Sequence, residues 1–378
     1  MSGGVDSSVV ALLLRDAGHE VVGLSMKLYD AGVARSASEI ADEACDATKA
    51  KGCCTPEDMN DARRVAAEIG IPHYVLDYSD AFEAAVIRPF VAEYARGRTP
   101  SPCVLCNDRL KFRALLMRAR ALGCAAIATG HYARVDAAGG RFRLLRARDR
   151  AKDQAYYLFG LGQNELRETL FPLGEMEKGE VRERARAAGL PVSDKPDSQE
   201  ACFLEGQSIA AFLSRHGVSS VRGEIVDERG ETRGRHEGAA RFTVGQRHGL
   251  AVADRHPLYV LSVDVGSNRV VVGPRESLAA RGLVADGARW VSGVAPAVNA
   301  EVLAQVRSRH TPVAARVEST GESMTVRFES PVIAVAPGQA VVVSRGDEIL
   351  GGGWIRDGFA DSSGDVAGPL ERRRGANP

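Results

Sequence analysis

The segment that decides the fold is SGGVDSS at residues 2–8, which runs directly into the apolar stretch SVVALLLRDA at residues 8–17. This stretch predicts a helix that ends at Gly18. Glycines let the backbone approach a ligand closely, and a helix N-terminus offers N–H groups with a partial positive charge. The segment therefore predicts a phosphate-binding loop, although a glycine turn that only caps a helix would have the same pattern.

The side chains of this loop restrict its chemistry. The loop lacks the lysine of a Walker loop, which argues against transfer of a γ-phosphate. Asp6 has the wrong charge for phosphate binding, unless it caps the helix or contacts a bound Mg²⁺. We therefore expect a ligand that contains phosphate and a reaction other than that of a kinase.

Strand-like and helix-like patterns alternate through the first two hundred residues. Strands are predicted at residues 20–26, 72–76 and 125–129, and helices at residues 8–17, 56–69 and 109–122. Strands separated by helices and glycine stops are typical of an α/β domain with a doubly wound parallel sheet. A strand should also precede the phosphate loop, and we expect it to be missing from this chain.

Beyond Gly206 the pattern changes to short alternating runs separated by turn signals, which predicts two small β-rich modules, the second of them a β-barrel. The expected domains are an α/β catalytic domain over residues 1–206, a central β-rich domain over 207–275, a C-terminal β-barrel over 276–358 and a disordered tail over 359–378.

Composition limits the possible partners and the compartment. The 378 residues include 49 Lys and Arg against 49 Asp and Glu, so a basic coat over the whole protein is excluded. No run approaches the roughly 18 apolar residues of a membrane span, and the N-terminus has no signal-peptide pattern. The seven cysteines are an odd number in a long chain, which favours reduced thiols and a cytoplasmic protein.

A local basic patch is still compatible with zero net charge. Arginines are dense between residues 141 and 150, where they could contact nucleic acid. The dipeptide Gly139-Gly140 marks a turn just before them, so an ordinary solvated hairpin face would have the same sequence.

Three cysteines lie in segments of unusual character. Cys103 and Cys106 form a C-x-x-C in the proline-stiffened stretch TPSPCVLCN, just ahead of the predicted helix 109–122, and Cys202 lies alone in a polar segment typical of a loop. A helix N-terminus favours a reactive thiolate. A zinc site built from this C-x-x-C and Cys53-Cys54 is an alternative, but adjacent cysteines chelate one metal awkwardly.

With these segments in place, the chain resembles the tRNA-specific 2-thiouridylases of the PP-loop ATP pyrophosphatase superfamily. The matching motifs follow the family's order from residue 2 to about residue 342: SGGVDSS, GLSMK (23–27), TPSPCVLCN (99–107), TGHYAR (129–134), AKDQAYYL (151–158), DSQEACF (197–203), FTVGQRHGL (242–250) and APGQAVV (336–342).

The resemblance implies an ATP-dependent 2-thiolation of the wobble uridine in tRNAs for Lys, Glu and Gln. AMP would pass from ATP to the uracil C2 oxygen, and sulfur would then displace it. Cys202 would carry the sulfur as a persulfide, and Cys106 would be the nucleophile. Attack of Cys106 on the persulfide would release sulfide and leave a Cys106–Cys202 disulfide. Alternatively, the Cys202 persulfide would attack the activated base directly. Mg²⁺ should accompany ATP, and a persulfide-donating sulfurtransferase or cysteine desulfurase relay should supply the sulfur.

The same resemblance implies binding residues, one position at a time. The expected ATP contacts are Met1, Ser2, Gly3, Gly4, Val5, Asp6, Ser7, Met26 and Gly130. The expected contacts to the target base or tRNA are Ser101, Pro102, Cys103, His131, Lys152, Asp153, Gln154, Arg307, Ser308 and Gln339. Three of these depart from the family pattern, which usually has Asn at Ser101, Asp at Cys103 and Tyr at Ser308.

Three alternatives stay open at this point. An iron–sulfur cluster held by Cys103, Cys106 and Cys202 would keep the thiolation and change its mechanism. A different PP-loop ligase would explain the phosphate loop but would not explain the pair Cys106 and Cys202. A tRNA-binding protein without catalysis would result if the loop without its first strand failed to bind ATP.

Overall fold

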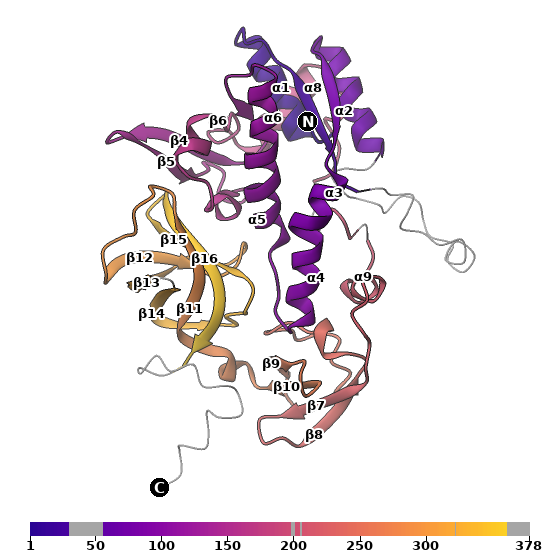
Figure 1. Ribbon diagram of the computed structural model, residues 1–378, viewed down its shortest axis with the longest axis vertical. Coiled ribbons are helices and arrows are strands. Elements are labelled where there is room, and N and C mark those ends of the chain that lie inside the picture. Colours follow the sequence, from indigo (N-terminus) through magenta and orange to yellow (C-terminus); the bar gives the residue numbers. More distant parts are fainter. Residues whose placement is uncertain (30–55, 198–200, 205, 322, 361–378) are drawn as a thin grey trace, which may run out of the picture. The chain divides into compact units, whose positions relative to one another are not determined.

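The computed structural model describes residues 1–29, 56–197, 201–204, 206–321 and 323–360 (Figure 1). The chain divides into two compact units. The first comprises Met1–Arg88 and Pro102–Ser208, and the second comprises Pro89–Ser101 and Ile209–Pro378. Among the described residues, no helix is long and apolar enough to cross a membrane.

The first unit is an α/β domain. Its helical elements are α1 (Val5–Asp16), α2 (Pro56–Ile69), α3 (Ser79–Phe82), η1 (Glu83–Ile87), α5 (Pro102–Cys106), η2 (Asn107–Ala114), α6 (Leu115–Ala121), η3 (Ala155–Leu158), α7 (Gln163–Arg167) and α8 (Lys178–Ala187). Its strands are β1 (Gly23–Lys27), β2 (His73–Asp77), β3 (Ile127–Ala128), β4 (Ala133–Ala138), β5 (Arg141–Arg146) and β6 (Thr169–Leu170).

Parallel pairing in this unit confirms the predicted α/β fold class. Strand β1 pairs in parallel with β2, and β3 pairs in parallel with β6. Within residues 1–4, ahead of α1, the structure describes no strand. Met1 instead contacts β1, because its ammonium group donates to the Leu24 carbonyl and its carbonyl accepts from Ser25 Oγ at 2.5 Å.

Helix α1 is held by its apolar face. Val9 is fully buried, and this face packs in one core with Val65 of α2 and with Val181 and Ala185 of α8. Burying one such valine stabilises the fold by roughly 1.5–3 kcal/mol. The packing fixes the N-terminus of α1, which carries the phosphate loop, against two neighbouring helices.

The helix that carries two of the cysteines starts earlier than the sequence predicts. Helical structure begins at Pro102 and continues through α5, η2 and α6 to Ala121, so the predicted start at Arg109 is wrong. Proline suits the first position of a helix, because the amide hydrogen it lacks has no partner there anyway. The middle segment η2 is a π-helix, a conformation frequent at functional sites.

The second unit contains α4 (Arg88–Ala95) from Pro89 onward, α9 (Ile209–Arg215), η4 (Ala239–Arg241) and η5 (Arg275–Leu278). Its first sheet contains β7 (Gly223–Asp227), β8 (Thr232–His236), β9 (Tyr259–Asp264) and β10 (Arg269–Gly273). The strand order is β8-β7-β10-β9, and only the β7–β10 pairing is parallel. Ile225, Val260, Val270 and Val272 form the core of this module.

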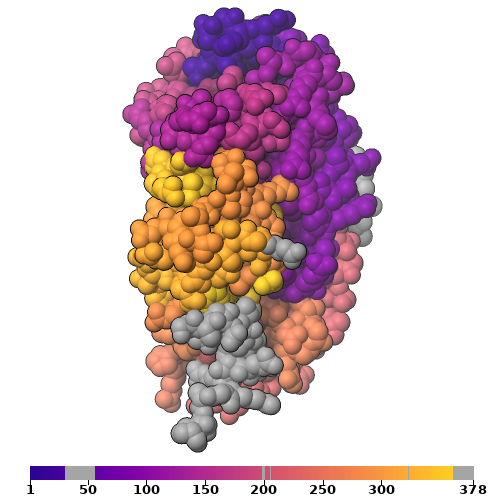
Figure 2. All heavy atoms as spheres, turned by 60° about the vertical axis from the view of Figure 1, so that its left-hand side comes forward, coloured from indigo at the N-terminus to yellow at the C-terminus, as the bar shows by residue number. Residues whose placement is uncertain are grey.

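Six further strands close into a β-barrel. They are β11 (Ala279–Trp290), β12 (Ala300–Gln305), β13 (Val313–Thr320), β14 (Ser323–Ile333), β15 (Ala340–Arg345) and β16 (Glu348–Phe359). The order is β11-β14-β13-β12-β15-β16, and β16 pairs back with β11. Closure pairs the two outer strands of this six-stranded sheet with each other. This closed ring of pairings confirms the predicted barrel, whose residues are coloured orange to yellow in Figure 2. Residues 361–378, most of the expected tail, lie outside the described residues.

Candidate active site

The phosphate loop ends in a helix terminus that no side chain caps. Gly4 is the N-cap residue of α1 in an extended conformation. Its carbonyl accepts hydrogen bonds from Ser8 N at 3.3 Å, Ser8 Oγ at 2.9 Å and Ser7 Oγ at 3.2 Å. The hydroxyl groups therefore fold the loop onto its own carbonyl. The N–H groups at the start of α1 remain directed outward, as an anion site requires.

Gly3 is a position that requires glycine for two reasons. Its φ of +69° lies in the left-handed region, and a Cβ atom there would lie 2.1 Å from the Asp58 carbonyl oxygen. Lys195 Nζ ties the same loop to α2, because it donates to Gly3 O at 3.1 Å and to carboxylate oxygens of Asp58 and Asp61 at 2.6 Å each. Burial disfavours the charged amine, but these carboxylates outweigh it and raise the pKa of Lys195.

A second glycine lets another segment approach the loop. Gly130 follows β3, and a Cβ atom on it would lie 3.0 Å from both Asp6 Cβ and Ser7 N. The Thr-Gly-His turn therefore packs directly against the first turn of α1. Of the other expected ATP residues, Val5 is buried under the loop, and Met26 lies on β1, half-buried.

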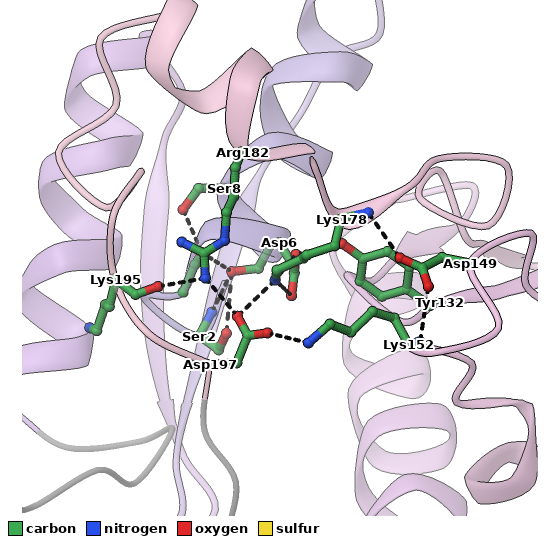
Figure 3. Close-up of polar contacts among 12 residues, drawn as sticks. Ser2, Asp6, Ser8, Tyr132, Asp149, Lys152, Lys178, Arg182, Lys195 and Asp197 are labelled. Carbon is green, nitrogen blue, oxygen red and sulfur yellow. Dashed lines mark hydrogen bonds and ion pairs between the residues drawn. The ribbon is translucent and has the colours of Figure 1, made fainter. Parts of the chain in front are cut away.

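Asp6 does not cap α1, so that alternative from the sequence is wrong. Its carboxylate instead accepts hydrogen bonds from Lys178 Nζ, at 2.7 and 2.8 Å, and from the Tyr132 hydroxyl at 3.0 Å (Figure 3). Burial and the negative charge of Asp6 raise the pKa of Tyr132 far above its ordinary value, so its hydroxyl stays a donor. Asp6 therefore positions a lysine that begins α8.

A cluster of three cations lies beside the loop and surrounds one carboxylate. Asp197 Oδ1 accepts from Lys178 Nζ at 2.9 Å and from Arg182 Nη2 at 3.2 Å, and Asp197 Oδ2 accepts from Lys152 Nζ at 2.8 Å (Figure 3). We call Lys152, Lys178 and Arg182 the three-cation cluster. Lys152 was predicted to contact tRNA, whereas Lys178 and Arg182 were not predicted as site residues. Their K-x-x-x-R spacing, which places both on one face of a helix, is the signal that the sequence offers for them.

This cluster predicts a pH-dependent contribution to stability. Burial disfavours the charged carboxylate, but hydrogen bonds from Lys152 and Lys178 outweigh it and lower the pKa of Asp197 from 3.8 to about 2. A lowered carboxyl pKa stabilises the fold above the unfolded value and loses that effect as the pH falls through the folded value. The Asp197→Asn variant should therefore be less stable than the unmodified protein at pH 5, by about 1 kcal/mol after solvent screening.

Urea unfolding of both proteins between pH 5 and pH 2.5 measures this contribution. The difference between them should shrink as the pH falls. Asp194→Asn is the matched control, because Asp194 pairs with Arg186 where both side chains are more than half exposed, and such pairs contribute little. A difference that stays constant over this range would show that Asp197 does not titrate as described.

The cysteines lie on two segments of the first unit. Cys106 is the last residue of α5 and is only 8% exposed, whereas Cys103 one turn earlier is exposed. Cys202 is half-buried, and its carbonyl accepts a hydrogen bond from the Tyr29 hydroxyl at 2.9 Å. The following Phe203 packs edge-on against Phe82. These contacts anchor the backbone around Cys202, while the Cys106–Cys202 disulfide stays a prediction.

The metal-binding alternatives gain no support from the described side chains. Among residues whose placement is described, no group of three or more His, Cys, Asp and Glu side chains is arranged to hold a metal ion. Cys103, Cys106 and Cys202, the three ligands expected for an iron–sulfur cluster, are among these described residues. Cys53 and Cys54, the other half of the zinc alternative, lie outside the described residues.

Several expected tRNA contacts in the first unit have structural partners. Asp153 forms an ion pair with Arg146 at 2.9 Å in which both side chains are nearly buried, and Gln154 Oε1 accepts from Tyr132 N at 3.0 Å. His131 is 9% exposed, and Thr129 Oγ1 lies 2.9 Å from its Nδ1. These contacts fix the turn around residues 149–155, and a tRNA contact of these residues stays a prediction.

The arginine-rich stretch is a hairpin whose charges are partly neutralised. Strands β4 and β5 pair antiparallel across Gly139 and Gly140, both with positive φ, which confirms the turn. Acidic residues pair with several of the arginines: Arg143 with Asp136, Arg146 with Asp153, and Arg148 with Glu177 and Glu180. The local positive potential is therefore weaker than the sequence suggests.

In the second unit, Gln339 holds the backbone that leads to the expected target-base tripeptide. Its Nε2 donates to Thr99 O at 3.0 Å and Pro100 O at 3.1 Å. The next residue, Ser101, is buried. Pro102 is the first residue of α5. Arg307 and Ser308 follow β12, and Gln305 Nε2 donates hydrogen bonds to the carbonyl oxygens of both residues. Gln339 thus fixes the backbone of Thr99 and Pro100, and the expected contacts of Gln339, Arg307 and Ser308 with tRNA stay predictions.

Together, the uncapped loop, its supporting glycine turn and the cations of α8 define a nucleotide-binding α/β domain of the PP-loop class. Residues 1–206 match the family model of the tRNA methyl transferase HUP domain, which belongs to this superfamily. Residues 210–274 match the tRNA methyl transferase PRC-barrel domain, and residues 280–355 match the aminomethyltransferase β-barrel domain. Use of ATP follows from this class.

Similarity to curated proteins identifies the particular family within this superfamily. The chain is 49% identical to the tRNA-specific 2-thiouridylase MnmA of Geobacter metallireducens over 358 residues, which is 94% of this chain and 95% of that protein. It is 47% identical to the protein of the same name from Solibacter usitatus over 367 residues, or 94% and 97% of the two chains. The chain belongs to the tRNA-specific 2-thiouridylase family, a family of tRNA sulfurtransferases.

Proposed function

We propose that this protein catalyses the ATP-dependent 2-thiolation of the wobble uridine in tRNAs for Lys, Glu and Gln. The observation that carries the proposal is the uncapped N-terminus of α1, at a loop that requires Gly3 and packs against Gly130, in the same unit as Cys106 and Cys202. Membership of the 2-thiouridylase family supports the choice of tRNA as substrate.

The first step activates the base. The uracil C2 oxygen attacks the α-phosphorus of ATP, the bond to the β-phosphate breaks, pyrophosphate leaves and the N3 proton is lost. The C2 oxygen is a poor leaving group until it carries AMP. Donors at the α1 N-terminus would stabilise the charge on the phosphates, and Mg²⁺ bound to them would neutralise more of it. Phosphate oxygens would supply most of the ligands of that ion.

The second step transfers sulfur. Cys202 carries a persulfide, whose outer sulfur comes from a sulfurtransferase or cysteine desulfurase relay in the cytoplasm. In one route the Cys106 thiolate attacks Cys202 Sγ, and the released sulfide attacks C2 and expels AMP. In the other route the persulfide attacks C2 directly and expels AMP, and Cys106 then attacks Cys202 Sγ to free the thiocarbonyl. Both routes end in a Cys106–Cys202 disulfide, which a two-electron reductant reopens.

The proposal is tested by following ATP in the absence of any sulfur donor. The purified protein, Mg²⁺ and ATP labelled at the γ-phosphate are incubated with unmodified tRNA-Lys transcript. We expect pyrophosphate release that requires the tRNA, because the activated base is made before sulfur is needed. A transcript with cytidine at the wobble position is the control. Pyrophosphate release that is equal with both transcripts, or absent with both, would contradict the proposed activation step.

A further inference from the structure

Two carboxylates hold the three-cation cluster together through ion pairs, and a third, that of Asp149, accepts hydrogen bonds from the backbone N–H groups of Lys152 and Lys178. Lys152, Lys178 and Arg182 contribute three cations, and Asp6 and Asp197 supply two carboxylates. Lys178 bridges both carboxylates, and its side chain is only 11% exposed. A lysine so poorly hydrated needs anionic partners, and a phosphate oxygen can take the place of the Asp197 carboxylate as one of them.

The cluster lies at the end of α1 where phosphates would bind. Lys178 Nζ is 2.7 Å from Asp6, a residue of the first turn of α1, and 2.9 Å from Asp197. Lys178 and Arg182 are four residues apart on α8, so both side chains project from one face of that helix, toward Asp197 (Figure 3). The outward N–H groups of α1 and the cations of α8 thus border the same region of the domain.

Asp197 lies in a different kind of segment from Asp6, Lys178 and Arg182. Asp6, Lys178 and Arg182 belong to α1 and α8, which pack in one core. Asp197 belongs to the irregular chain after α8, five residues before Cys202. Its carboxylate makes the contacts that a phosphate oxygen would make, with one oxygen on Lys178 and Arg182 and the other on Lys152.

We propose that Lys178 and Arg182 bind the β- and γ-phosphates of ATP, and that Asp197 occupies this phosphate site as an exchangeable counter-ion when no nucleotide is bound. Nucleotide binding and the Asp197 contacts then exclude each other. Arrival of ATP displaces the Asp197 carboxylate and frees Lys152 from its ion pair, and departure of pyrophosphate allows Asp197 to return. The inference rests on the proposed ATP site and adds a competitor within the chain itself.

The exchange predicts that removing the competitor improves binding. If Asp197 occupies the site about nine-tenths of the time, the Asp197→Asn variant should bind Mg·ATP and inorganic pyrophosphate about tenfold more tightly, because the competent state is no longer a minor one. Lys178→Met should weaken binding of both by at least about tenfold, since it removes a charge-assisted contact. Isothermal titration calorimetry on the full chain measures both affinities.

Asp194→Asn is the matched control, because it removes the same charge three residues away, from an exposed pair with Arg186 on the same helix. We expect its affinities to equal those of the unmodified protein. Asp197→Ser serves as a second variant if Asp197→Asn does not fold, and circular dichroism verifies folding. Unchanged or weaker binding in the folded Asp197 variant would overturn the inference, and so would an equal gain in Asp194→Asn.

Activity separates the two proposals: if the protein thiolates tRNA but Asp197→Asn gains no affinity, only the exchange fails. If the affinity rises but tRNA does not stimulate pyrophosphate release, only the proposed function fails.

Discussion

Replacing Cys106 or Cys202 by serine should lower the rate of tRNA thiolation at least about a thousandfold, because a hydroxyl can neither carry a persulfide nor displace sulfur from one. The double variant should be no worse than either single variant, since the two thiols act in one transfer. Binding of tRNA should stay within about twofold of the unmodified protein, because Cys106 is nearly buried and serine is close in size. Nucleoside mass spectrometry and a filter-binding assay measure these two quantities.

Cys124→Ser is the matched control for this experiment. Cys124 follows α6 and is partly exposed like Cys202, but it has no part in the proposed transfer. It should keep full activity. A Cys103→Ser variant addresses the C-x-x-C, whose first cysteine is exposed. Substantial thiolation by either Cys106→Ser or Cys202→Ser would remove that cysteine from the mechanism.

The Gly130→Val variant should lose most of its affinity for ATP, by at least about tenfold, the effect expected when a packed site is forced apart by added side-chain atoms. The Cβ atom would lie 3.0 Å from Asp6 Cβ and Ser7 N, so the turn after β3 and the first turn of α1 must separate. Separation moves Asp6 and the outward N–H groups that we assign to phosphate. The affinity for Mg·ATP is measured by isothermal titration calorimetry.

Gly179→Ala is a control that also replaces a glycine close to the site. A Cβ atom on Gly179 meets nothing within 4 Å, and the residue lies inside helix α8. Alanine there should leave ATP affinity unchanged and stabilise the helix by about 0.5–1 kcal/mol. Thermal unfolding of both variants separates loss of the site from loss of the fold. Unchanged ATP affinity in Gly130→Val would place the nucleotide elsewhere.

Much of this fold was predictable from the periodicity of apolar residues and from the glycine and proline residues at the ends of elements. Helix α2 begins and ends at the predicted residues 56 and 69, because an apolar stripe of helical period runs between Pro56 and Gly70. The short alternating runs after Gly206 predicted strands such as β7 and β10 for the same reason. Local sequence alone determines such elements.

The start of the cysteine helix was not predictable in this way. TPSPCVLCN contains two prolines and reads as a loop, yet Pro102 occupies the first helical position, where proline is tolerated, and helical structure continues into a π-helix. A π-helix has no simple sequence signal. The cysteines therefore lie on a helix, where a loop was expected.

The sequence also did not predict which side chains contact one another within the site. Motif spacing indicated the loop and Gly130, but nothing local connects Asp6 with Lys178, which is 172 residues away. The role of Asp6 follows only from the packing of α8 beside α1. Likewise, Asp153 reads as a surface residue in a polar motif, yet it is nearly buried in an ion pair with Arg146.

The most direct test of the central claim is the formation of 2-thiouridine. The protein is incubated with ATP, Mg²⁺, unmodified tRNA-Lys transcript, and a cysteine desulfurase with cysteine as the persulfide donor, and the digested tRNA is analysed by nucleoside mass spectrometry. We predict 2-thiouridine at the wobble position that depends on ATP and is absent with Gly130→Val. An intact, folded protein that binds ATP and tRNA yet forms no 2-thiouridine would contradict the account.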